Sequence, residues 1–155
     1  MITPNDILQK LAAMVGEKFP GEPVYQDLTP TDFQRPSSLV VYDGGSADVG
    51  CGCQAVELRL QYTVTTFAEV DAYHDSHLAA LHIRQMQLLS LLLPGYIKVK
   101  GRAPKVGEVK LDGGYDFDSV TVTFHIALDR SEFEAITQHG DMLTLHLRTE
   151  VETYG

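Results

Sequence analysis

The chain has 155 residues, of which 44% are hydrophobic, a size and composition typical of one globular domain with a sizeable core. Its 12 basic and 21 acidic residues give a formal charge of −9, which argues against a protein that binds nucleic acid through a basic surface. The start of the sequence lacks a basic segment followed by an apolar run, and its longest apolar run is too short for a bilayer. We therefore expect neither export nor membrane insertion.

A helix is predicted near the start of the chain, where residues 3–6 read Thr-Pro-Asn-Asp. Thr3 can cap the helix, Pro4 suits its first position, and Asp6 falls where the carboxylate of a capping box belongs. We expect the helix to end near residues 19–21, with short strands following at 24–27 and 38–42. It is expected to pack through one apolar stripe, formed by Ile7, Leu8, Leu11, Met14 and Val15.

Residues 43–54 are rich in glycine and predict a long loop. Long loops in compact domains often contact partners, so we expect an oligomer or partner interface here. Two cysteines that are two residues apart rarely close an unstrained disulfide, and no further cysteine completes a zinc site, so we expect reduced thiols. The predicted interface residues are Asp43, Gly44, Gly45, Ser46, Asp48, Cys51, Cys53 and Gln54.

Two segments, 56–64 and 119–128, alternate apolar and polar residues and predict strands of one sheet. The apolar face of each is expected to lie inside, and the other face is polar and rich in threonine. A linker is expected around 132–134. Weaker strand patterns lie at 96–100, 106–111 and 142–151, with an Asp-Gly-Gly turn at 112–114.

The apolar period lengthens to about 3.6 residues over 72–93, which predicts the main packing helix, ended by Pro94-Gly95. Arg84 and Gln87 fall on its polar outer arc, and Gln85 interrupts the apolar stripe. The whole pattern predicts a single α+β domain over residues 1–155, with a mostly antiparallel sheet, two helices packed on one face, and a last strand at about 142–151. The stripe that packs on the sheet consists of Leu78, Leu81, Leu88, Leu89 and Leu92.

The histidines do not form a convincing metal site. His74 and His77 lie one helical turn apart and could touch one ion, but no third ligand accompanies them. An enzyme that uses this pair with a carboxylate, such as a small metal-dependent hydrolase, stays open as an alternative. His82 is expected to be a partly buried packing residue.

Other polar motifs favour structural roles. The Asp-Gly-Gly segments at 43–46 and 112–115 lack the spacing of phosphate-binding loops and predict turns. The acidic residues on either side of Phe117 and of Phe133 are expected to be solvated. We therefore predict no enzyme activity, and no catalytic, cofactor-binding or metal-binding residue.

Short motifs at residues 18–27, 33–40, 73–94, 112–113 and 142–145 follow one another in a recognisable order. Taken together, they resemble a family of small phage tail terminator or tail completion proteins, common in phages and prophages of Gram-positive bacteria. Members pair a Lys-Phe-Pro and Val-Tyr segment with a Phe-x-Arg-Pro-Ser segment, as at 18–27 and 33–40 here. A leucine-rich helix follows, then a hairpin with an Asp-Gly turn and a Met-x-x-Leu stretch, as at 73–94, 112–113 and 142–145. The Cys-Gly-Cys segment and the histidines near residue 74 depart from the family pattern.

The resemblance implies a non-enzymatic virion protein that caps the tail tube and offers a surface to the head. It implies self-association into a ring, often a hexamer, with a tail tube protein and a head–tail connector protein as partners. No sequence-specific nucleic acid, membrane or cofactor is implied. The expected location is the virion tail, and the host bacterial cytoplasm during assembly. A head–tail connector or another tail component is the nearest alternative.

Overall fold

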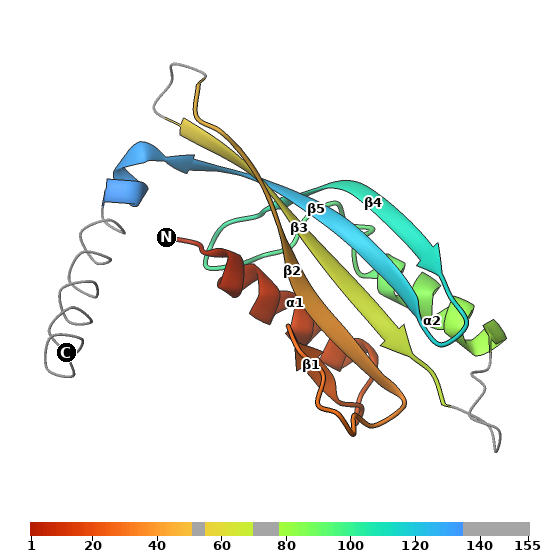
Figure 1. Ribbon diagram of the computed structural model, residues 1–155. Coiled ribbons are helices and arrows are strands. Elements are labelled where there is room, and N and C mark those ends of the chain that lie inside the picture. The colour runs from red at the N-terminus through yellow and green to blue at the C-terminus, as the bar shows by residue number, and fades with distance from the viewer. Residues whose placement is uncertain (51–54, 70–77, 135–155) are drawn as a thin grey trace, which may run out of the picture.

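Five strands and two helices build an α+β fold around a mixed sheet in this computed structural model, which describes residues 1–50, 55–69 and 78–134 (Figure 1). The strand order is β1-β2-β3-β5-β4. Strands β1 and β2 pair in parallel, and the pairs β2–β3, β3–β5 and β4–β5 are antiparallel. In chain order the elements are α1 (Pro4–Lys18), β1 (Val24–Gln26), β2 (Ser37–Asp48), β3 (Ala55–Phe67), α2 (Leu78–Ser90), β4 (Lys105–Gly113) and β5 (Asp118–Asp129).

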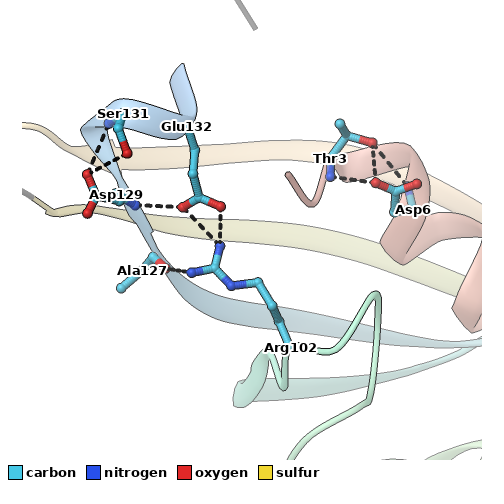
Figure 2. Close-up of polar contacts among 7 residues, drawn as sticks. All are labelled: Thr3, Asp6, Arg102, Ala127, Asp129, Ser131 and Glu132. Atoms are coloured by element: carbon cyan, nitrogen blue, oxygen red, sulfur yellow. Dashed lines mark hydrogen bonds and ion pairs between the residues drawn. The ribbon is translucent and has the colours of Figure 1, made fainter. Parts of the chain in front are cut away.

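Helix α1 begins with the predicted capping box. The Asp6 N–H donates to the Thr3 hydroxyl at 3.3 Å, and the Thr3 N–H donates to the Asp6 carboxylate at 2.8 Å (Figure 2). Both bonds use backbone donors of the first turn, which lack the usual helical partner four residues earlier, and the Asp6 N–H also donates to the Thr3 carbonyl oxygen at 3.0 Å. Together these bonds stabilise the start of the helix. Burial disfavours the charged form of Asp6, but the bonds from Thr3 and the nearby Lys100 ammonium outweigh it and lower the pKa of Asp6.

The two alternating segments form the predicted central strands, β3 and β5. Tyr62 pairs with Val122 in the antiparallel register, and both residues are fully buried. The Tyr62 hydroxyl donates to the Pro4 carbonyl oxygen at 2.7 Å, which fastens the strand to the start of α1, and burial raises the pKa of Tyr62. Leu58 is half-buried. The other inward residues of the pair are buried: Val56, Leu60, Val64, Val120, Phe124, Ile126 and Leu128.

Helix α2 differs from its prediction in extent and in orientation. It ends at Ser90, and residues 72–77 lie outside the described part of the chain. Leu81, Leu88 and Leu92 are buried as expected, but Leu78 is 43% exposed and Leu89 is only half-buried. The helix is rotated relative to the predicted apolar stripe because polar side chains of its inner face reach backbone and acidic groups near the sheet.

Arg84, predicted to point outward, makes the strongest of these polar contacts. Its guanidinium donates to the Glu22 carboxylate at 2.7 and 3.2 Å and to the Thr66 hydroxyl at 2.7 Å. It also lies over the Phe19 ring, 4.2 Å from the centroid. Gln85 donates to the carbonyl oxygens of Asp112 and Ser119 at 2.9 and 3.0 Å, so the predicted break in the stripe is a second tether to the sheet.

The prediction of a strand at 96–100 is wrong, whereas the predicted pairing of β4 with β5 is confirmed. Residues 96–105 turn back on themselves and make only two isolated bridges, Tyr96 with Lys105 and Val99 with Arg102. The reversal occurs at Lys100 and Gly101, which have φ of 48° and 76°. A segment that folds onto itself at this point cannot extend along a neighbouring strand, although its apolar residues Ile97 and Val99 are buried.

The linker predicted around 132–134 is a short helical segment that covers residues 130–134. Asp129 precedes it, and its carboxylate accepts from the Ser131 N–H at 3.0 Å and the Ser131 hydroxyl at 3.1 Å. The bond from the Ser131 N–H is the larger cause, and the bond from the Ser131 hydroxyl the smaller, of a lowered pKa at Asp129. The strand predicted at 142–151 lies outside the described residues.

Candidate functional site

The loop predicted at 43–54 is mostly strand. Strand β2 continues to Asp48 and pairs with β3 as far as Glu57, so only residues 49–54 connect the two strands. The register shifts between Tyr42 and Gly44, and Gly44 takes a φ of 91°, which marks a bulge. A Cβ at Gly45 would lie 1.9 Å from the Arg59 carbonyl oxygen. The glycines therefore permit a bulge and close strand pairing, and the predicted turn at 43–46 is wrong.

Five of the predicted interface residues lie together on the outer part of β2. Asp43, Gly45, Ser46 and Asp48 are exposed, and Gly44 is half-buried. The Thr63 hydroxyl donates to the Asp43 carboxylate, and the Asp48 carboxylate accepts from the Gly50 N–H at 3.2 Å. The other three predicted residues, Cys51, Cys53 and Gln54, lie outside the described part of the chain.

This part of the β2–β3 hairpin extends beyond α1 as an arm, here defined as residues 44–50 and 55–60 (Figure 1). The end of β5 accompanies it, and Arg130 donates to the Val49 carbonyl oxygen at 3.0 Å. The arm is therefore a paired hairpin supported along β3 by β5, and a partner could contact its strands as they stand.

The face of the sheet opposite the core is polar, as the threonine pattern predicts. Thr63, Thr65, Thr121 and Thr123 are all partly exposed. The hydroxyl oxygens of Thr63 and Thr121 lie 3.3 Å apart across the β3–β5 pair. Within the described residues this face offers alternating donors and acceptors to a partner.

A cleft that the sequence does not indicate lies where β4 begins and β5 ends. It has a volume of about 450 Å³, and its lining includes Glu57, Lys105 and His125. The His125 Nδ1 atom lies 3.7 Å from a Glu57 carboxylate oxygen. Lys105 is exposed and has no ion-pair partner among the described residues. Residues from three separate segments meet here, which no local motif could reveal.

Arg102 also lines the cleft and is held in place from one side. Figure 2 shows its guanidinium between the Glu132 carboxylate and the Ala127 carbonyl oxygen. The bonds to Glu132 measure 2.9 and 3.1 Å, and the bond to Ala127 measures 3.3 Å. Glu132 also accepts from the Asp129 N–H at 2.7 Å, so the helical segment and the cleft wall form one unit.

The β4–β5 turn contains a buried acid where sequence reasoning expected a solvated one. Asp118 is completely buried, and its carboxylate accepts from the Gly114 N–H at 3.2 Å. It also lies 2.6 Å from the Nδ1 atom of His82, whose side chain is 58% exposed. His82 is therefore an exposed partner of a buried carboxylate, and its predicted packing role is wrong.

The described residues contain no group of three or more side chains suited to hold a metal ion. His74 and His77 lie outside those residues, so the structure does not place them. Among the described residues, no helix is long and apolar enough to span a bilayer. No protein-family model matches the sequence, and no curated protein matches it.

Proposed function

We propose that this chain is a non-enzymatic structural protein of a phage or prophage tail, which caps the tail tube and provides the surface that joins the head. The family resemblance motivates the proposal. The single structural feature that supports it best is the arm, because an extension of paired strands with exposed polar residues suits assembly better than catalysis. The proposed site is the virion tail, reached from the host cytoplasm during assembly.

The proposed role involves a ring of identical subunits, a hexamer in many members of the family that the chain resembles. Subunits would meet through the arm and through the exposed sheet edges. A bulge between Val106 and Val109 interrupts the edge strand β4, so the arm is the larger continuous surface. A hexamer would carry six times the formal charge of −9. An acidic lumen would let DNA pass without binding, through like-charge repulsion.

The fold proposed with this role is a mostly antiparallel sheet with both helices on one face. Three antiparallel strand pairs support the first part. A small apolar space among residues of α1, α2, β3 and β5 supports the second part, because it is lined by side chains of both helices. Its lining includes Leu11 and Val15 from α1, Leu88 from α2, Val64 from β3 and Val122 from β5.

Labelling of purified tails tests the location that we propose. An antibody against the chain should mark the end of the tail that joins the head, at one site per tail, under the electron microscope. Label on heads that lack tails would instead favour the head–tail connector alternative. Virions and tails without any label would remove the chain from the virion and contradict the proposal.

Shortening the arm tests the surface that we propose. Replacement of residues 48–57 by Asn-Gly would join the paired residues Ala47 and Leu58 through a two-residue turn. The variant should fold and should fail to complete tails or to join heads. Its matched control is Lys18→Glu, an exposed position at the end of α1 and outside both the arm and the strands, which should assemble normally. Full assembly by the shortened variant would remove the arm from the mechanism.

A further inference from the structure

The β4–β5 hairpin is long, and its two ends lie at opposite ends of the strands (Figure 1). The cleft lies where β4 begins and β5 ends, and the turn at residues 114–117 lies at the other end. Strand β4 has nine residues. At a rise of about 3.3 Å per residue, its ends lie roughly 26 Å apart. The turn therefore cannot reach the cleft of its own chain.

The turn presents an aromatic side chain from a backbone that is already fixed. Tyr115 is 86% exposed. The buried Asp118 accepts from the Gly114 N–H, and Gln85 donates to the carbonyl oxygens of Asp112 and Ser119. A fixed turn loses little conformational freedom when it binds, and tyrosine is among the residues that most often anchor interfaces.

The cleft has the size and charge to accept an aromatic residue with acids beside it. Its volume of about 450 Å³ lies within the range of about 300–1,000 Å³ that is typical of clefts for small ligands. Among the described lining residues the basic side chain without an ion-pair partner is Lys105, because Arg102 is paired with Glu132. Apolar contact area comes from the lining residues Ala103, Ile126 and Ala127.

We propose that the β4–β5 turn of one copy binds in the cleft of a second copy, with Tyr115 as its anchor. Asp112 is exposed three residues before Tyr115, and its carboxylate matches the Lys105 ammonium of the cleft in charge. This inference rests on the proposed ring assembly and adds a defined contact to those proposed for the arm and the sheet edges. Because the two surfaces differ, the contact is heterologous: each subunit offers its turn to one neighbour and its cleft to the other. Repetition of this contact closes a ring when the rotation between subunits fits.

Photo-cross-linking tests the contact directly. Tyr115 is replaced by p-benzoylphenylalanine in the full chain, and the protein is irradiated at concentrations up to about 1 mM, where even weak contacts form. Salt at about 0.15 M screens repulsion between two acidic chains beyond roughly 8 Å. The cross-link should join two chains and map to residues 101–105 or 125–127. The same probe in place of Tyr96, as a control, should give no cross-link to the cleft.

A mixing experiment tests whether the contact joins the turn of one subunit to the cleft of another. Lys105→Glu should damage the cleft and Tyr115→Ser the turn, and each should weaken self-association about tenfold or more, the loss typical of a central anchor. Mixed in equal amounts, the two variants should form a dimer that does not grow, because one intact cleft meets one intact turn. Lys110→Glu, with the same charge change on the same strand, should associate like the unmodified chain in sedimentation.

The outcomes separate this contact from the proposed function. A chain that stays monomeric at every concentration and gives no cross-link to the cleft would overturn the contact. Cross-links confined to other surfaces, or single variants that associate normally, would overturn it as well. If the cross-link forms but loss of the gene leaves tails normal, the contact stands and the tail role fails. If loss of the gene gives abnormal tails but the cross-link does not form, the tail role stands and the contact fails.

Discussion

Helices α1 and α2 both pack on the sheet, but their sequences relate to that packing in different ways. In α1 the apolar stripe is the buried face: Ile7, Leu11 and Val15 are all nearly inaccessible. In α2 the apolar residues surround most of the helix, and the contacts of Arg84 and Gln85 decide which of them are buried. Hydrophobic periodicity therefore orients a helix only when a single face is apolar. Otherwise a few hydrogen bonds select among orientations of similar hydrophobic energy.

The largest expected effect comes from the buried side of α2. Leu81 is completely buried, and Leu81→Asp should destabilise the chain by about 5 kcal/mol or more, because it adds an unpaired charge to lost apolar packing. A domain of ordinary stability would unfold. The matched control is Ile83→Asp, two residues away and 61% exposed, which should change stability by about 0.5 kcal/mol or less. Equal effects in thermal melting would contradict the orientation of α2.

A smaller effect should come from loss of the Arg84 contacts that hold α2 in its orientation. Arg84→Ala removes the partner of Glu22, whose side chain is only 21% exposed, together with the contact over the Phe19 ring. The expected loss is about 2–3 kcal/mol, since a partly buried charge is left unpaired. Gln87→Ala, an exposed position on the same helix, should be nearly neutral in urea unfolding. If Arg84→Ala proved equally neutral, hydrogen bonds could not explain the rotation of α2.

The smallest effect should come from the cap of α1, and it should depend on pH. The pKa of Asp6 is lowered in the folded chain from an ordinary value of 3.8. Ionised Asp6 therefore adds stability that is complete above that value and is lost as the pH falls through the lowered pKa. At pH 7, Asp6→Asn should cost about 1 kcal/mol, as the loss of a cap does. The gap should close well below pH 4, and a gap of constant size would exclude this role for the charge.

Much of the fold follows from local sequence. The capping box of α1 and the alternation of β3 and β5 each depend on residues close together in the chain, and both are confirmed. The turn predicted at 112–114 is displaced, because Asp112 and Gly113 pair within the β4–β5 ladder and the chain turns at residues 114–117. Strand β2 was predicted too short because glycine normally weakens a strand. Here Gly44 and Gly45 serve a bulge and a close approach to Arg59, which depend on the partner strand rather than on local preference.

The candidate site was less predictable because its parts are distant in sequence. Glu57, Lys105 and His125 meet only through the strand order, and no motif joins them. The burial of Asp118 likewise depends on His82, which lies 36 residues earlier in the chain. An acid next to exposed aromatic residues gives no local sign of such a partner. Polar residues that reach across elements are the features that pattern analysis missed throughout this molecule.

Tail length in the absence of the chain is the measurement that tests the proposed role most directly. The gene is deleted from the phage or prophage that carries it, and the particles are measured by electron microscopy, with a plasmid copy as the control. A protein that caps the tail tube predicts tails of uncontrolled length that do not join heads, and normal particles once the gene is restored. Particles with tails of normal length, joined to heads and fully infective, would contradict it.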